Sequence, residues 1–202
     1  MYMEFNGRVY YIVRTGNLSS IMERGILSYN GCHNQGLGHA SFALSDVQER
    51  RDGVVIPNAL PLHDYVCLYF NPRNATLFYL RDKPNFEETC ILVIDGNRLL
   101  GQEGVVISDR NAATSFASFL QPEHIGNLDF GRIYARSWNH QDEVEKRLHK
   151  AEMCSELLVP HKVDSEFILG ALTQSQDMSD QIEALGLGLQ TQVSKVKFFI
   201  SE

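Results

Sequence analysis

Glu156 is a carboxylate at a point in the sequence where a charge is costly. Residues 142–151 (DEVEKRLHKA) have the pattern of a charged amphipathic helix, and residues 157–159 have that of a buried strand closed by Pro160. Glu156 therefore stands where a strand enters the core, and desolvating a carboxylate is unfavourable unless it is paired or hydrogen-bonded. Two interpretations stay open here: the side chain points into solvent, or a function justifies its burial.

Other side chains suited to chemistry lie at the ends of predicted elements. Arg50 and Arg51 end a predicted helix, a polar turn over residues 14–17 follows the first strand, and an aromatic strand over residues 63–70 ends in Asn-Pro-Arg-Asn. Such a set suits cleavage of an N-glycosidic bond, because a carboxylate stabilises an oxocarbenium-like ribose and arginine binds a diphosphate. Cations at a helix C-terminus and polar residues at a helix start are equally ordinary structural features.

The sequence lacks the patterns of several other catalytic classes. Neither GxGxxG after a strand nor GxxxxGK[ST] occurs, and there is no GxSxG and no HxxxH on a helix. The sequence therefore predicts no metal site and argues against a doubly wound nucleotide-binding sheet. Cys67 and His63 are four residues apart on a predicted strand, which we interpret as packing because a nucleophilic pair needs a third orienting group.

Composition places the chain among single-domain proteins. Its 202 residues are 44% apolar with no linker, so we expect one domain over residues 1–202. Four scattered cysteines without a CxxC pair predict reduced core thiols, and the absence of a signal peptide or a long apolar run predicts a cytoplasmic protein that does not enter the membrane. The net charge of −7 argues against broad nucleic-acid binding, so such contacts would need a local basic patch.

Hydrophobic patterning predicts an α+β fold with five to seven short strands in an antiparallel or mixed sheet. Long alternating βαβ units are absent. The predicted strands are 9–13, 63–70, 90–94, 105–107, 157–159 and 193–200. The predicted helices are a short one from Leu18 that Gly25 stops, 45–51, 75–80 (helix or turn), 109–119, 142–151 and 177–185, with a turn at 95–97 and a polar connector around Trp138.

Five blocks of sequence, taken together and in this order, resemble the DarT family of bacterial toxins. They are residues 10–21 (YYIVRTGNLSSI), 47–51 (VQERR), 63–74 (HDYVCLYFNPRN), 109–112 (DRNA) and 155–160 (SELLVP). The resemblance implies an NAD-dependent ADP-ribosyltransferase that modifies bases in single-stranded DNA. It also implies an ADP-ribosyltransferase-like fold, with a split antiparallel or mixed β core and short peripheral helices, and a separate macrodomain antitoxin, DarG, as partner.

The resemblance also assigns roles to individual residues. Glu156 matches the family's catalytic glutamate, and Arg51 matches an arginine that handles NAD and assists the attacking base, with Arg50 as the alternative in register. The NAD-binding segment after the first strand corresponds to Tyr11, Arg14, Thr15, Asn17 and Ser20. The residues that pack around nicotinamide correspond to Tyr69, Phe70, Asn74 and Phe78.

This sequence departs from the family pattern in the expected NAD pocket. The family commonly has His at Arg14, Ser-Pro-Met at residues 74–76 and Tyr at Phe78, so a neutral ring becomes a cation and a phenolic donor is lost. The sequence does not specify the acceptor base either, because no motif in the loop expected to select it, within 28–48 or 109–140, indicates a particular base. DNA is the expected acceptor, RNA is possible, and a protein acceptor or a non-catalytic NAD-binding module are the alternatives.

Overall fold

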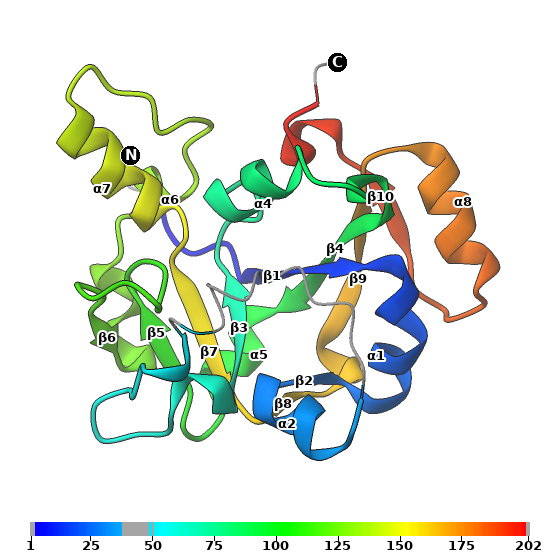
Figure 1. Ribbon diagram of the computed structural model, residues 1–202, viewed down its shortest axis with the longest axis horizontal. Coiled ribbons are helices and arrows are strands. Elements are labelled where there is room, and N and C mark those ends of the chain that lie inside the picture. The colour runs from blue at the N-terminus through cyan, green and yellow to red at the C-terminus, as the bar shows by residue number, and fades with distance from the viewer. Residues whose placement is uncertain (1–2, 38–48, 50, 201–202) are drawn as a thin grey trace.

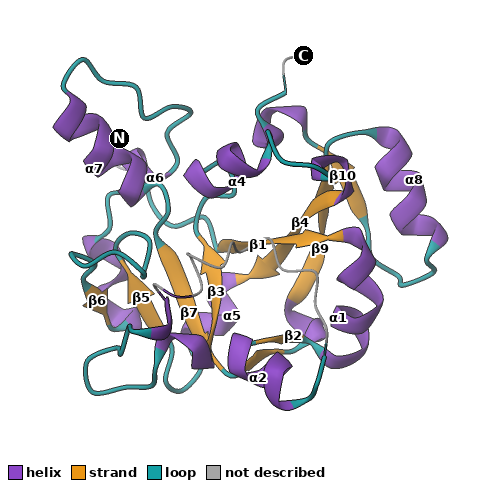
Figure 2. Ribbon diagram, viewed as in Figure 1, coloured by secondary structure: helices purple, strands orange, loops and turns teal. Residues whose placement is uncertain are grey.

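The computed structural model describes residues 3–37, 49 and 51–200, and its centre is an eight-stranded mixed sheet (Figures 1 and 2). The strand order is β10-β9-β4-β1-β3-β7-β5-β6, and only β9 and β10 run parallel. These strands are β1 (Arg8–Arg14), β3 (Tyr65–Tyr69), β4 (Thr89–Asp95), β5 (Val106–Ser108), β6 (Phe119–Leu120), β7 (Glu156–Pro160), β9 (Ile168–Thr173) and β10 (Thr191–Val193). A separate ladder joins β2 (Ile26–Leu27) to β8 (Lys162–Val163).

Short helices surround the sheet (Figure 2). They are α1 (Leu18–Arg24), α2 (Tyr29–Asn34), α4 (Ala75–Leu80), α5 (Gly96–Leu100), α6 (Phe130–Ile133), α7 (Glu143–Glu152) and α8 (Gln176–Ala184). Six 3₁₀ turns complete the described part, at Thr15–Asn17, Leu62–Asp64, Phe86–Glu88, Pro122–Asn127, Ser165–Phe167 and Lys195–Phe198. In this described part no helix is long and apolar enough to span a membrane.

The sheet is nearly divided between β1 and β3. Strand β1 pairs with β4 at seven successive positions, whereas it pairs with β3 at the single position Tyr10↔Tyr69. Beyond that point β1 continues to Arg14 without a partner on the β3 side. On β3, Tyr69 also lies opposite Glu156 of β7. The first residue of β7 is therefore next to the place where the two halves of the sheet part.

Alternation along β3 assigns its side chains to different surroundings. Val66, Leu68 and Phe70 belong to the main hydrophobic core. Tyr65 and Cys67 belong to a smaller cluster under the loops before β3 and after β5. Because successive side chains of a strand point to opposite faces, Tyr69 shares the face of Cys67, and Phe70 does not.

Several predicted elements are confirmed. Strands are present within 9–13, 90–94, 105–107 and 157–159, and helices cover most of 18–24, 75–80, 142–151 and 177–185. Gly25 ends α1 as expected, with φ of 85° and its N–H donated to the carbonyl of Ile21 at 2.8 Å. A side chain at this glycine would also meet the Val163 carbonyl of β8, since an added Cβ would lie 2.5 Å from that oxygen.

The helix predicted over residues 109–119 is wrong, because residues 109–118 form a loop closed by its own polar side chains and Phe119 begins β6. Asp109 accepts a hydrogen bond from the backbone N–H of Ser118 at 2.8 Å, and Asn111 accepts one from the N–H of Ala113 at 2.9 Å. The Thr114 hydroxyl donates to the carbonyl of Asn111 at 2.8 Å. Short polar side chains that bind nearby backbone in this way compete with helix formation.

The other wrong predictions involve short elements. The strand predicted over 193–200 ends at Val193, and Phe198 is instead fully buried in the last 3₁₀ turn. The turn predicted at 95–97 is the start of α5, which Asp95 caps through the N–H of Arg98 at 3.1 Å. The elements α2, α6, β2, β6, β8 and β9 were not predicted from the sequence, and the described residues form more strands than the five to seven expected. Of the helix predicted over 45–51, only residues 49 and 51 are described, and both are helical.

Candidate active site

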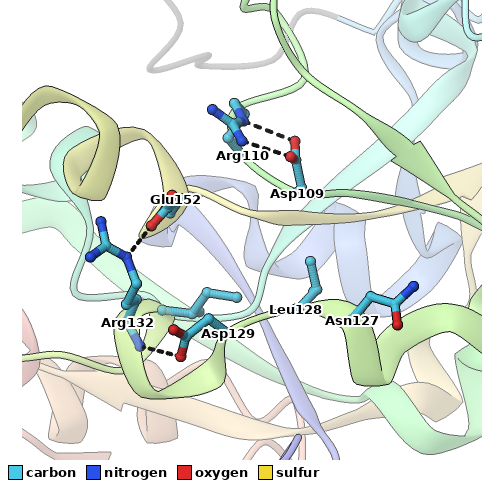
Figure 3. A pocket seen from close by; sticks show the side chains of 8 residues that line it. Asp109, Arg110, Asn127, Leu128, Asp129, Arg132 and Glu152 are labelled. Carbon is cyan, nitrogen blue, oxygen red and sulfur yellow. Dashed lines mark hydrogen bonds and ion pairs between the residues drawn. The ribbon is translucent and has the colours of Figure 1, made fainter. Parts of the chain in front are cut away.

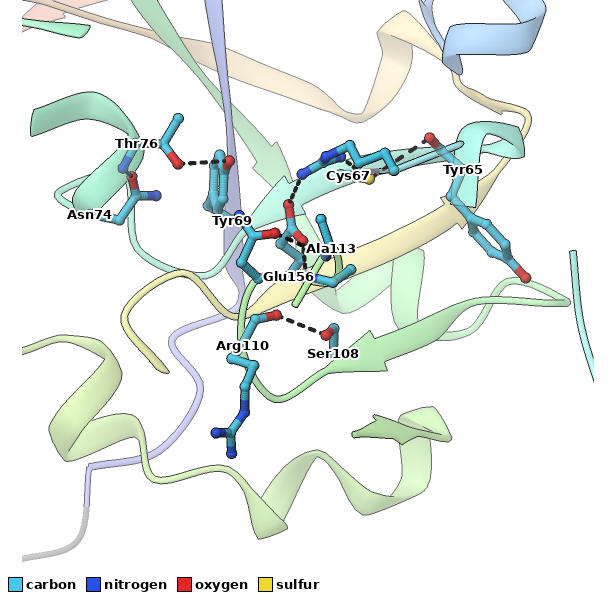
Figure 4. A network of polar contacts seen from close by, with 12 residues as sticks. Tyr65, Cys67, Tyr69, Asn74, Thr76, Ser108, Arg110, Ala113 and Glu156 are labelled. Atoms are coloured by element: carbon cyan, nitrogen blue, oxygen red, sulfur yellow. Dashed lines mark hydrogen bonds and ion pairs between the residues drawn. The ribbon is translucent and has the colours of Figure 1, made fainter. Parts of the chain in front are cut away.

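The carboxylate of Glu156 is fully buried, and both of its oxygens are hydrogen-bonded (Figure 4). Arg51 donates from Nη2 to Oε1 at 2.8 Å, and the backbone N–H of Ala112 donates to Oε2 at 2.8 Å. The expectation that a carboxylate here must be paired is confirmed, and the interpretation that it points into solvent is wrong. The desolvation cost is offset by one cation and one backbone dipole.

Arg51 uses its guanidinium to join two strands. While Nη2 binds Glu156, Nη1 donates to the sulfur of Cys67 at 2.9 Å, and the side chain is only 14% exposed. Burial alone would lower the pKa of Arg51, but Cys67 and the Glu156 carboxylate outweigh it and raise that pKa well above its usual value. Arg51 is therefore a permanent cation whose direction is fixed by two partners.

Three described neighbours of this pair, Cys67, Tyr11 and Tyr69, have raised pKa values and are neutral at physiological pH. Burial raises the pKa of the Cys67 thiol to about 11 and that of the Tyr11 phenol to about 12. Burial also raises the pKa of Tyr69, whose hydroxyl shares a hydrogen bond of 3.1 Å with the Thr76 hydroxyl. Arg51 and Glu156 are thus the charged members of this set of described side chains.

A second set of contacts fixes the backbone on both sides of Glu156. The hydroxyl of Ser155 donates to the carbonyls of Asp109 and Glu152, at 2.6 Å each. The hydroxyl of Ser108 donates to the carbonyl of Arg110 at 2.7 Å. The loop after β5 is therefore tied to the start of β7, and this positions the Ala112 N–H at the carboxylate.

The structure brings Glu156, Arg51 and Tyr69 of the predicted site together. Tyr11 lies on β1 directly after Tyr10, the residue that pairs with Tyr69. The segment predicted to bind NAD begins where β1 has run past its pairing with β3. Arg14 forms an ion pair with Glu88 at 3.2 Å, Thr15 and Asn17 are half-buried, and Ser20 is exposed on α1. Arg50 lies outside the described residues.

Three of the residues predicted to surround nicotinamide are placed by the structure in packing or capping roles. Phe70 has no exposed surface, and its ring lies 5.5 Å from Phe5 and 5.6 Å from Phe130 in the core. Asn74 is fully buried and caps α4, accepting from the N–H groups of residues 76 and 77. Phe78 packs edge-on against Trp138 and Phe199, at 5.5 and 5.1 Å.

Two members of the site were not predicted from the sequence. Ala112 acts through its backbone N–H, and a backbone donor has no signature in a sequence. Cys67 was interpreted as packing, but its sulfur is a hydrogen-bond partner of Arg51. All four cysteines are free, as predicted.

Comparison with known proteins identifies the family. The profile described as "ssDNA thymidine ADP-ribosyltransferase, DarT" matches residues 10–199. The chain belongs to the DarT family. Among curated relatives, a DNA ADP-ribosyl transferase of Thermus sp. (strain 2.9) is 29% identical over 149 residues, which cover 69% of this chain and 70% of the relative.

A second DarT relative is longer than this chain. It is a fusion protein of Thermosipho africanus named as a DNA ADP-ribosyl transferase joined to a DNA ADP-ribosyl glycohydrolase, 23% identical over 178 residues. The match covers 87% of this chain and 44% of the fusion protein, so the chain spans less than half of that relative.

Solved DarT structures share the fold. The Thermus sp. 2.9 DarT in complex with ADP-ribosylated ssDNA superposes with a TM-score of 0.81 and 25% identity over 98% of this chain and 99% of that one. Thermosipho africanus DarTG in complex with ADP-ribose gives a TM-score of 0.83 and 21% identity over 96% of this chain and 51% of that one. The predicted ADP-ribosyltransferase-like α+β fold is confirmed.

Proposed function

We propose that this protein transfers ADP-ribose from NAD to a base of single-stranded DNA and releases nicotinamide. The observation that carries the proposal is the buried Glu156 carboxylate, held between Arg51 and the Ala112 N–H at the point where the sheet divides. A buried charge of this kind costs stability, and that cost is typical of a residue kept for chemistry. The description of the DarT family and the ssDNA bound to the Thermus relative support the choice of acceptor.

The proposed reaction breaks one bond and forms another at the same ribose carbon. The bond from C1′ to the nicotinamide nitrogen breaks, and its electron pair leaves with nicotinamide. A nitrogen of the target base then forms the new bond to C1′ and loses its proton. Glu156 would hold a ribose hydroxyl, stabilise the developing cation and accept that proton.

Arg51 would serve both substrates by changing partners. In this structure it donates to the Glu156 oxygen Oε1, and a ribose hydroxyl that takes over this position would release the guanidinium. A guanidinium released in this way can bind a phosphate of NAD or polarise the attacking base. Arg51 would therefore keep the carboxylate charged and oriented until substrate arrives.

The remaining NAD contacts are assigned by position. Tyr69 lies opposite Glu156, and Tyr11 follows the residue that pairs with Tyr69, so both would contact the nicotinamide ribose. Arg14, Thr15 and Asn17 lie where β1 has run past its pairing with β3, and they would bind the rest of NAD. Phe70 and Phe78 pack against other aromatic rings, and Asn74 caps α4. We therefore assign these three residues a supporting role behind the NAD-binding surface.

The setting of the reaction follows from its substrates. NAD and single-stranded DNA are both available in the cytoplasm, where we propose that a single transferase domain over residues 1–202 acts. The Thermosipho africanus relative is fused to a DNA ADP-ribosyl glycohydrolase, which supports a DarG-like partner that removes the modification. The ligand of the Thermus relative is ADP-ribosylated ssDNA, which favours DNA over RNA as the acceptor.

The acceptor is tested by offering the alternatives side by side. Purified protein is incubated with NAD and, separately, single-stranded DNA, RNA of matched sequence and lysate protein, and the mass added to each is measured. The proposal expects one ADP-ribose on DNA, located on a base by fragmentation. ADP-ribose on protein alone would favour the protein-acceptor alternative, and calorimetric NAD binding without turnover would favour a non-catalytic module; either result would contradict the proposal.

A further inference from the structure

A polar pocket of about 310 Å³ lies behind the loop that holds Glu156 (Figure 3). Its wall includes Arg110 from this loop, Asn127 and Asp129 from the segment before α6, Arg132 from α6 and Glu152 from α7. Figure 4 shows the Arg110 guanidinium pointing away from Glu156, on the opposite side of the loop. The pocket is therefore separate from the Arg51–Glu156 pair but shares a wall with it.

The charges of the pocket are already largely paired. Arg110 binds the neighbouring Asp109 carboxylate through Nε at 3.0 Å and Nη2 at 2.7 Å. Arg132 binds Glu152 through Nε and Glu145 through Nη1. Because carboxylates outnumber guanidinium groups on this wall, it does not favour a phosphate.

Several hydrogen-bonding groups of the wall remain available to a ligand. In the part of the chain that the structure describes, neither the side-chain amide of Asn127 nor Arg110 Nη1 has a hydrogen-bond partner, and Asp129 uses only Oδ1, which accepts from the N–H of Arg132. The free set contains both donors and acceptors around an apolar floor of Leu128 and Ile133. A flat, uncharged molecule with donors and acceptors on its edge matches such a surface, and a nucleobase has this chemistry.

An aromatic side chain extends the same surface. The Arg110 guanidinium lies 5.1 Å from the ring centre of Phe116, and Phe116 is 51% exposed. Exposed aromatic rings and guanidinium planes are the side chains on which unpaired bases stack. The loop thus presents Glu156 with a backbone donor on one side and offers a base-stacking pair on the other.

The pocket is also close enough to Glu156 for a neighbouring base. Arg110 is two residues from Ala112, so their backbones are at most about 7 Å apart, and the Ala112 N–H lies 2.8 Å from the catalytic carboxylate. Successive nucleotides of one strand are about 3.4 Å apart along a duplex axis and farther apart in an extended single strand. A base one or two positions from the target falls within this reach.

We propose that this pocket binds a base of the single-stranded substrate that flanks the modified base, and that Asn127 and Arg110 select its identity. The proposal rests on the function proposed above and adds a sequence preference to it. Binding at the pocket would also affect the position of Glu156, because the Asp109 carbonyl accepts a hydrogen bond from Ser155, the residue before Glu156.

The test uses oligonucleotides with one modifiable base, in which each flanking position carries in turn the four bases or no base. Initial rates of ADP-ribose transfer are measured by mass spectrometry for the wild type, for Asn127→Ala and for Asn127→Asp, with Asn97→Ala on α5 as the matched control. Asn127 and Asn97 are both exposed, so these changes leave folding intact, which thermal unfolding verifies.

The wild type and Asn97→Ala are expected to prefer one base at one flanking position by about tenfold. Asn127→Ala should reduce this preference to about threefold or less by slowing the preferred oligonucleotide, with the rate on the abasic oligonucleotide unchanged, and Asn127→Asp should shift the preference toward another base. An unchanged preference, no preference in the wild type, or an equal loss on every oligonucleotide would overturn the pocket assignment alone. Absence of transfer to any oligonucleotide would overturn the proposed function as well.

Discussion

Replacing Arg51 by methionine should destabilise the protein far more than an ordinary surface change. The Glu156 carboxylate has no exposed surface, and after Arg51→Met it keeps a single hydrogen bond, from the Ala112 N–H. Removing one partner of a buried ion pair typically costs about 3–5 kcal/mol, because the remaining charge is left without compensation. We expect a loss in this range near pH 7.

The companion variants separate the cost of the charge from the cost of the lost contacts. Glu156→Gln should cost about 1–3 kcal/mol, because the amide still accepts from the Ala112 N–H while Arg51 loses its carboxylate partner. The double variant Arg51→Met/Glu156→Gln removes both charges and should be more stable than Arg51→Met alone. It should also lack transferase activity, so stability and function would respond in opposite directions.

Urea unfolding of the wild type and the three variants gives this double-mutant cycle directly. The control is Arg24→Met, whose side chain is 46% exposed and pairs with the adjacent Glu23, so a change within about 0.5 kcal/mol is expected. A loss below about 1 kcal/mol for Arg51→Met, or strictly additive losses in the double variant, would refute the reasoning that the pair is an obligatory buried unit.

Three further predictions concern other parts of the structure. Cys67→Ala removes the acceptor of Arg51 Nη1 and should lower kcat/KM for labelled NAD by about tenfold, whereas Cys67→Ser should restore most of it; equal effects of the two changes would contradict this role. Phe198→Ala should cost about 3–5 kcal/mol in urea unfolding, because this ring is fully buried, and a loss below about 1 kcal/mol would contradict its placement. Burial raises the pKa of Cys90 to about 12 and of Cys154 to about 11, so both thiols stay neutral in the folded state while the unfolded thiols ionise. Each should therefore contribute full stability below pH about 8.5 and lose about 1.4 kcal/mol per pH unit above it; a urea midpoint that is the same at pH 8 and 10 would contradict this.

The central strands were predictable because they are buried on both faces. Residues 90–94 and 157–159 are continuous apolar runs, which is the pattern of strands inside a covered sheet. The position of Glu156 at the start of such a run also predicted a carboxylate that needs a partner. The residue pattern alone could not predict that this partner is Arg51, because Arg51 is 105 positions away in the sequence.

Adjacent residues of one strand end can have different surroundings that the sequence alone does not distinguish. Tyr69 and Phe70 are adjacent aromatic residues at the end of a strand, and alternation puts one beside Glu156 and the other in the core. Which one faces the site depends on the register between β3 and β7, which no local pattern encodes. The helix predicted over residues 109–119 failed for a different, local reason: the hydrogen bonds of Asp109 and Asn111 outweighed the helical tendency of an alanine-containing segment.

The most direct test of the account compares wild type with Glu156→Gln in transfer of ADP-ribose from labelled NAD to single-stranded DNA, with Glu103→Gln, an exposed glutamate, as the control. The substitution keeps the shape of the side chain and removes only its charge. We predict that Glu156→Gln folds and still binds NAD but transfers at least about 100-fold more slowly, while Glu103→Gln matches the wild type. Transfer by Glu156→Gln at the wild-type rate would contradict the assignment of this carboxylate and of the site built around it.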